Sequence, residues 1–179
     1  MAAQKEVAAP SRKRTFGARI RGMILIIAAA AVLAGTLFMP VFRIYGNSMS
    51  PTLEKGEMVA ALKGQDWRQG DIIAFWYHNK ILVKRLIAEP GSQVDIAADG
   101  MVYVDGAPLF ESYLTDRSAG TCSIELPCSV PEGEYFVLGD ARDISADSRN
   151  AQIGCIAKED VIGRIVLRLW GANGIGPVW

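Results

Sequence analysis

The sequence has a single histidine, His78, and only three cysteines among its 179 residues. One histidine excludes a site built from several histidine ligands, and a Ser-His-Asp triad would have to use this residue. His78 falls in the apparent turn 77–80, where a histidine is more often a solvated surface residue. Covalent chemistry in this chain therefore needs another base, and we expect neither a metal ion nor an organic cofactor.

The chain also has no net charge, because 19 basic residues balance 19 acidic ones, yet these charges are separated along the sequence. Residues 1–22 hold six basic groups and one acid, residues 23–42 hold none, and the remainder holds 13 basic and 18 acidic groups. This division argues against an ordinary cytosolic protein and against a nucleic-acid binder. It predicts a basic cytoplasmic arm (1–22), a transmembrane helix (23–42) and an extracytoplasmic domain (43–179).

The segment 23–42 is mostly apolar, and twenty helical residues rise about 30 Å, the thickness of the hydrocarbon core of a bilayer. The preceding Arg and Lys residues should stay in the cytoplasm, so we expect a single-pass protein of the plasma (inner) membrane with its domain outside. A cleaved signal peptide, cut near Ala34 and Gly35, is the main alternative. A buried core helix is disfavoured by the length and by the lack of charge.

The cysteines agree with export. Cys122 and Cys128 lie six residues apart in a loop-like stretch that has no histidine or second cysteine pair to suggest zinc. In an oxidising compartment this spacing favours a small disulfide loop over two unpaired thiols. Cys155 is left over, and we expect it to be a small core residue rather than a nucleophile.

From Arg43 onward, short apolar runs alternate with turn residues. The runs are rich in Ile, Val, Phe and Tyr, and Gly, Pro and Asp separate them, a pattern typical of strands. We therefore expect a mainly β fold, a compact antiparallel domain of about 135 residues that can bury its own core, with an irregular tail at 171–179. The predicted strands are 58–62, 71–77, 81–88, 93–96, 101–104, 135–138 and 161–169.

Lys84 is the best candidate for a general base. Strand alternation along 81–88 places it on one face with Leu82 and Leu86. Burial among apolar groups disfavours the ammonium form, so a lowered pKa would leave a usable neutral amine near neutral pH. A lysine at a strand edge with its head in water is the commoner case, and alternation alone does not decide between the two.

A nucleophile is suggested by the segment 46–53, which reads Gly-Asn-Ser-Met-Ser-Pro-Thr-Leu. Gly46 permits close backbone approach and Pro51 favours an extended Ser50, so Ser48 should lie on a bent, exposed turn. Such a turn can aim backbone N–H groups at a developing oxyanion. A third polar cluster, 139–149, alternates acids and bases and contains two serines, and a solvated, salt-bridged loop explains it equally well.

These three clusters, in this order behind an apolar N-terminal segment, resemble the type I signal peptidase (leader peptidase) family, membrane-bound serine proteases with a Ser-Lys dyad. The resemblance runs from the apolar segment to about residue 168. Ordered motifs of this kind are a specific signal. The matching segments are 46–53, 70–73, 83–94, 135–149 and 161–164.

By this resemblance, Ser48 is the nucleophile, and Lys84 is the general base that takes its proton and later passes it to the leaving amine. Ser145 orients the lysine through a hydrogen bond. The oxyanion site uses the Ser48 backbone N–H, because Gly46 lacks the hydroxyl that some relatives carry at this position. The resemblance also implies ion pairs that brace the site among Asp140, Arg142, Asp147 and Arg149, and a bilayer-facing Met49.

The implied function is an endopeptidase that removes N-terminal signal peptides, with small residues at the first and third positions before the cut, from exported precursor proteins. Two departures from the family pattern concern specificity: Ala141 and Ile144 replace asparagines, and four residues rather than two separate Arg149 from Gly154. A dedicated conjugation or pilin-processing peptidase is therefore one alternative. A catalytically inactive, membrane-tethered interaction protein is another. A self-cleaving regulator is disfavoured because 42 residues cannot supply a DNA-binding module upstream.

Overall fold

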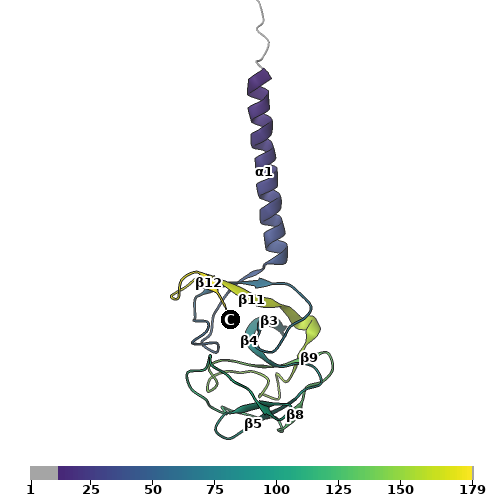
Figure 1. Cartoon of the computed structure of the whole chain (residues 1–179), viewed down its shortest axis with the longest axis vertical. Coiled ribbons are helices and arrows are strands. Elements are labelled where there is room, and N and C mark those ends of the chain that lie inside the picture. The colour runs from purple at the N-terminus through teal and green to yellow at the C-terminus, as the bar shows by residue number, and fades with distance from the viewer. Residues whose placement is uncertain (1–11, 179) are drawn as a thin grey trace, which may run out of the picture. The chain divides into compact units, whose positions relative to one another are not determined.

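The structure is a computed structural model that describes residues 12–178 (Figure 1). The chain divides between Phe38 and Met39 into two compact units. Residues 1–11, about half of the predicted basic arm, and Trp179 lie outside the described residues.

The first unit is a single helix, α1 (Arg12–Phe38). No proline interrupts these residues, whereas Pro40 explains the end of the helix, because proline disfavours helical geometry at the preceding residue. The helix therefore begins before the predicted segment 23–42 and ends within it, and Val41 and Phe42 belong to a strand. Between residues 12 and 178 no helix is long and apolar enough to cross a membrane, so the predicted span is not confirmed.

The second unit consists of short strands, and it confirms the expected mainly antiparallel β class. The strands are β1 (Val41–Arg43), β2 (Met58–Leu62), β3 (Ile72–Tyr77), β4 (Lys80–Ala88), β5 (Gln93–Ile96), β6 (Val102–Val104), β7 (Ala107–Pro108), β8 (Cys128–Ser129), β9 (Glu134–Leu138), β10 (Ile156–Ala157), β11 (Val161–Trp170) and β12 (Gly176–Pro177), with a short 3-10 helix, η1 (Lys158–Asp160), before β11.

Two antiparallel sheets make up this unit. The larger sheet has the order β1-β2-β11-β3-β4-β9-β10, with β12 paired to β11, and the smaller one has the order β7-β6-β5-β8. Figure 1 shows β5 and β8 at the opposite end of the unit from β12. The seven predicted strands correspond to β2, β3, β4, β5, β6, β9 and β11. The strands that were missed have two or three residues, too few to show a period of two.

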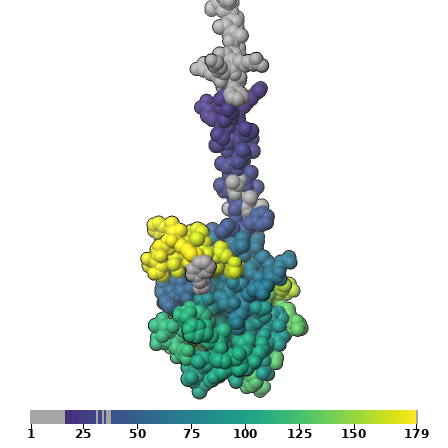
Figure 2. All heavy atoms as spheres, in the orientation of Figure 1, coloured from purple at the N-terminus to yellow at the C-terminus, as the bar shows by residue number. Residues whose placement is uncertain are grey.

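The C-terminal tail is more regular than expected. β12 pairs with β11, and Val178 is buried in the core rather than being part of an irregular terminus. The yellow C-terminal segment forms one flank of the unit in Figure 2. The reason is that residue 178 can bury an apolar side chain once the chain reverses at Gly174, which has a φ of 72°.

Alternating side chains of the large sheet pack into three buried clusters. One of them contains Met49, which is 2% exposed and packs with Leu53, Val59 and Ile165. The expectation that this methionine faces the bilayer is therefore wrong. The turn after β1 folds back over the sheet, so the apolar side chain next to Ser48 points into the core.

The three cysteines are free thiols, so the predicted disulfide between Cys122 and Cys128 is not formed. Cys122 is exposed, whereas Cys128 packs with Cys155 against the core cluster of the small sheet. Burial, together with the neighbouring Cys128 thiol, raises the pKa of Cys155 to about 12. The Cys155 thiol is thus protonated at neutral pH, in keeping with a small core residue rather than a nucleophile.

Candidate active site

Ser48 and Lys84 come from different elements and meet at one point. Lys84 is at the centre of β4, and Ser48 lies on the turn between β1 and β2. Lys84 Nζ and Ser48 Oγ are hydrogen bonded at 2.7 Å. The lysine is only 3% exposed, so the buried interpretation of the strand pattern is correct and the exposed strand-edge interpretation is wrong.

The environment of Lys84 favours its neutral form. Burial lowers the pKa of Lys84 from 10.5 to about 8, and Arg149 acts in the same direction, whereas the carboxylates of Asp147 and Asp140 partly oppose the change. A general base must hold an unprotonated lone pair at working pH. At pH 8 about half of the Lys84 side chains meet that requirement, against well under a tenth for an ordinary lysine.

The turn that carries Ser48 is fixed by its own hydrogen bonds. Ser50 N–H donates to Asn47 O at 3.1 Å, and Leu53 N–H donates to Met49 O at 2.8 Å. The Ser48 carbonyl accepts from the backbone N–H of Ala141 at 3.0 Å, which attaches the turn to the segment after β9. Within residues 12–178 the Ser48 N–H has no hydrogen-bond acceptor, which leaves it available to an oxyanion.

Four charged side chains of the polar cluster 139–149 are buried, so the interpretation as a fully solvated loop is wrong, although Asp143 and Ile144 are exposed. Asp140, Arg142, Asp147 and Arg149 are each at most 3% exposed. Only Asp147 and Arg149 pair with each other, through two side-chain contacts of 2.8 Å. Asp140 and Arg142 form ion pairs with residues from elsewhere in the chain, and the site-bracing role of the four residues stays a prediction.

One of these missed partners is Arg85. Its guanidinium forms a two-point ion pair with Asp140, at 2.9 Å and 2.7 Å, and donates to Gly70 O at 2.9 Å. Arg85 follows Lys84 in β4, so the two side chains point to opposite faces of the strand. The pair therefore holds the segment after β9 against the strand that carries Lys84.

The second missed partner is Glu111, from the segment between β7 and β8. It forms a buried ion pair with Arg142 and accepts a hydrogen bond from Tyr113 Oη at 2.5 Å. The Tyr113 ring lies 3.8 Å from the guanidinium of Arg85, which is stacked over it, an arrangement that favours the cation. Burial and Glu111 raise the pKa of Tyr113, so its hydroxyl stays protonated.

Ser145 lies behind the dyad but makes no hydrogen bond to Lys84. Its buried hydroxyl has no partner of good geometry among the described residues, although it is close enough to Asp147 to contribute to the lowered pKa of that carboxylate. Burial alone would raise the pKa of Asp147, and Arg149 outweighs it. The lysine-orienting role of Ser145 stays a prediction.

An apolar cavity of about 680 Å³ opens beside the dyad. Ser48, Lys84 and Gly46 line it together with apolar side chains of β1 and β4, including Phe42 and Val83. β1 is the last strand of the large sheet, so its outer edge is unpaired in the sheet order. A cavity and a free strand edge next to a serine and a lysine with a lowered pKa suit an extended peptide that is attacked at a backbone carbonyl.

His78 takes no part in this arrangement. It is exposed in the turn between β3 and β4, with a φ of 50°, and its ring contacts Tyr77 with 4.4 Å between centroids. Across residues 12–178 no group of three or more His, Cys, Asp or Glu side chains is arranged to hold a metal ion.

Comparison with known proteins shows the family. The family model described as "Signal peptidase, peptidase S26" matches residues 18–170. This chain belongs to that family, which confirms the resemblance seen in the sequence motifs.

Individual relatives cover most of the chain. Signal peptidase I of Bacillus licheniformis is 34% identical over 166 residues, which make up 86% of this chain and 88% of the relative. Signal peptidase IB of Staphylococcus aureus is 34% identical over 170 residues, which make up 82% of this chain and 87% of the relative. A crystal structure of a signal peptidase I from Enterococcus faecalis V583 is 32% identical, with a TM-score of 0.47, and covers 57% of this chain and 98% of that chain.

Proposed function

We propose that this protein is a serine endopeptidase that removes N-terminal signal peptides from exported precursor proteins, with Ser48 as nucleophile and Lys84 as general base. The observation that carries this proposal is the 2.7 Å contact between Ser48 Oγ and the buried Lys84 Nζ. Family membership supports the same class of reaction.

The chemistry follows from the lowered pKa of the lysine. Neutral Lys84 takes the proton of Ser48 as Oγ attacks the scissile carbonyl, and the Ser48 N–H stabilises the oxyanion. Collapse of the tetrahedral intermediate breaks the C–N bond, and Lys84 gives its proton to the departing amine. Water, activated in turn by Lys84, then hydrolyses the acyl-enzyme. Ser145, whose buried hydroxyl has no hydrogen-bond partner of good geometry in the described chain, would orient the lysine during these transfers.

The apolar cavity supplies a site for the signal-peptide side of the scissile bond. Its walls include Phe42, Ile44 and Ile81, which suit small apolar side chains, although Arg43 and Lys80 also line the cavity. An extended substrate can add to the outer edge of β1 by backbone hydrogen bonds, which position the scissile bond over Ser48.

We further propose that the apolar segment 23–42 attaches the enzyme to the plasma membrane, with residues 1–22 in the cytoplasm and the β unit outside it. The support is chemical: α1 exposes large apolar side chains such as Ile26, which is 70% exposed, and Arg19 and Arg21 precede them. Protease accessibility of the β unit in intact and opened membrane vesicles tests the orientation.

Cleavage of a signal-bearing precursor in vitro tests the proposed reaction. We expect Ser48→Ala and Lys84→Ala each to lower kcat by at least about a thousandfold, because removing either member removes the covalent route. His78→Ala is the matched control and should retain turnover close to that of the wild type. An inactive His78→Ala together with an active Lys84→Ala would overturn the dyad.

A dedicated processing peptidase remains the second candidate, because Ala141 and Ile144, which replace family asparagines, line a cavity next to the Ser48 turn. A generic precursor with alanine at the first and third positions before the cut separates the two candidates. Efficient cleavage of this precursor supports the general role, and selective cleavage of a pilin-type precursor alone supports the dedicated one.

A further inference from the structure

Two cavities border the turn that carries Ser48. The apolar cavity is lined by residues 41–46, Ser48 and Met49 from this part of the chain, whereas a second cavity, of about 420 Å³, is lined by Asn47, Ser50 and Pro51. The turn thus separates the two cavities. The second one is completed by Thr115 and Asp116 and by residues 140–144.

The second cavity is tied closely to the nucleophile. Ala141, in its wall, donates its backbone N–H to the carbonyl of Ser48 at 3.0 Å. Any peptide whose scissile carbonyl lies over Ser48 must extend away from it in both directions. If the signal-peptide side occupies the apolar cavity, the leaving side must pass over the turn, where the second cavity is the concave site that it meets.

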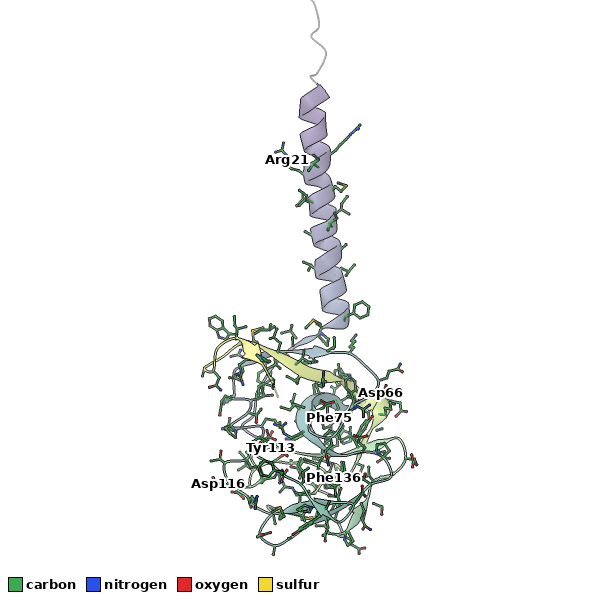
Figure 3. All side chains as sticks on the ribbon, in the orientation of Figure 1. Arg21, Asp66, Phe75, Tyr113, Asp116 and Phe136 are labelled. Carbon is green, nitrogen blue, oxygen red and sulfur yellow. The ribbon has the colours of Figure 1, made fainter. Side chains whose placement is uncertain are left out.

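Two carboxylates, those of Asp116 and Asp143, set the charge of the second cavity. Asp140 and Arg142 also line it, but their charges are compensated by the buried pairs with Arg85 and Glu111. The other charged side chains in the lining, Asp116 and Asp143, are exposed and form no ion pair among residues 12–178. Tyr113 and Asp116 lie on the same flank of the unit in Figure 3.

The lining also includes one large apolar side chain. Ile144 is 66% exposed, although it belongs to a segment whose other members are mostly polar. An exposed isoleucine at the wall of a cavity is available to pack against an apolar side chain of a bound peptide. It is also one of the two positions at which this chain departs from the asparagines typical of its family.

We propose that the second cavity binds the first residues of the mature protein, on the leaving-group side of the scissile bond, and that Ile144, Asp116 and Asp143 determine which residues are accepted there. Ile144 favours an apolar side chain directly after the cut. The two carboxylates disfavour acidic residues in the next positions. This inference rests on the proposed signal-peptide cleavage, and it adds to that reaction a specificity for the exported product.

The test uses the full-length enzyme in detergent and a set of quenched fluorescent peptides. All have alanine at the first and third positions before the cut and differ only in the two residues after it. For the wild type we expect kcat/KM to be about fivefold lower with aspartate than with asparagine at the second position after the cut. This is the size expected of a solvent-screened charge effect. Leucine directly after the cut should be cleaved severalfold faster than serine.

The variants assign these preferences to residues. In the double variant Asp116→Asn, Asp143→Asn the aspartate penalty should fall below about twofold, whereas Glu125→Gln, an exposed carboxylate outside the cavity lining, should keep it. Ile144→Asn should abolish the leucine preference. Ile175→Asn, at an exposed isoleucine outside both cavities, should retain it.

The outcomes separate this inference from the proposed function. Cleavage that is indifferent to the residues after the cut, or preferences that survive in the cavity variants, would overturn the subsite while leaving the peptidase intact. Failure of the wild type to cleave any peptide or precursor would overturn the proposed function, and the subsite with it.

Discussion

At the scale of single residues, Lys84 shows how one buried group defines the chemistry. Lowering a lysine pKa from 10.5 to about 8 corresponds to a net cost of about 3 kcal/mol for the charged form, in which burial is the largest contribution and the effects of the neighbouring charges are already included. The carboxylates of Asp147 and Asp140 reduce this cost, and Arg149 adds to it, so that the pKa stays within reach of physiological pH. A pKa near 8 makes a neutral Lys84 amine available at mildly alkaline pH, as the proposed role of general base requires.

The pH dependence of cleavage follows from this pKa. Because the neutral amine is the active form and its population rises with pH through about 8, kcat/KM should increase about tenfold per pH unit below 7 and level off above about 9. Initial rates on a neutral peptide between about pH 5.5 and 10 measure the profile on both sides of that pKa. A rate independent of pH from acid to alkaline conditions would contradict the role of Lys84.

At the scale of elements, the segment after β9 is held behind the dyad by contacts from three directions. Asp140 joins it to β4, Glu111 joins it to the segment between β7 and β8, and the N–H of Ala141 joins it to the Ser48 turn. Gly139 is needed at the centre of these contacts, because a Cβ there would collide with Ser145 Oγ and with the Ser48 carbonyl.

Gly139→Ala should therefore be strongly harmful. The Cβ would push the Ser48 turn away from β9 and from Lys84, so we expect a fall in kcat of at least about a hundredfold, since displacements of about 1 Å cost that much. Gly176→Ala is the matched control, because a Cβ added at Gly176 would have no atom within 4 Å, and it should keep activity. Wild-type turnover by a folded Gly139→Ala protein would refute this close packing.

The ion pair between Glu111 and Arg142 gives a prediction on stability. Glu111→Gln leaves a buried guanidinium without a countercharge, and breaking such a pair costs about 3 kcal/mol of unfolding free energy. Urea denaturation at neutral pH measures this loss. Glu125→Gln, at an exposed position, should change the midpoint little, and equal midpoints for the two variants would count against the pair as a stabilising contact.

At the scale of the whole molecule, the β unit contains the complete machinery for the proposed reaction. Its three buried clusters draw their members from residues 42–178, and Phe75 and Phe136, labelled in Figure 3, are fully buried in two of them. The segment proposed to attach to the membrane belongs to the other unit, so the proposal assigns anchoring and catalysis to different units.

A chain that starts at Met39 should therefore fold. We expect its unfolding free energy to lie within about 1 kcal/mol of that of the full-length protein, because no core residue is removed. Thermal and urea unfolding followed by circular dichroism compare the two. The shortened chain should also lose membrane association in a flotation experiment. A shortened chain that does not fold, or one that still floats with the membranes, would contradict the assignment of folding and attachment to separate units.

The sequence by itself determined the features that depend on local order. Alternation predicted β2, β3, β4, β5, β6, β9 and β11, because an extended strand has a period of two that a few residues display. Short motifs singled out Ser48 and Lys84, because a bent turn and a strand position are specified by neighbouring residues. The segregation of charge along the chain was equally visible without a fold.

Only the tertiary structure shows which residues that are far apart in the sequence contact each other. Arg85 meets Asp140 over 55 residues, and Arg142 meets Glu111 over 31, so neither pairing is encoded in a local pattern. The burial of Lys84, the inward direction of Met49 and the unjoined Cys122 and Cys128 were settled by the packing of whole sheets. Burial is a sum over all surrounding elements, and it is this sum, rather than the lysine itself, that turns Lys84 from an ordinary cation into a candidate base.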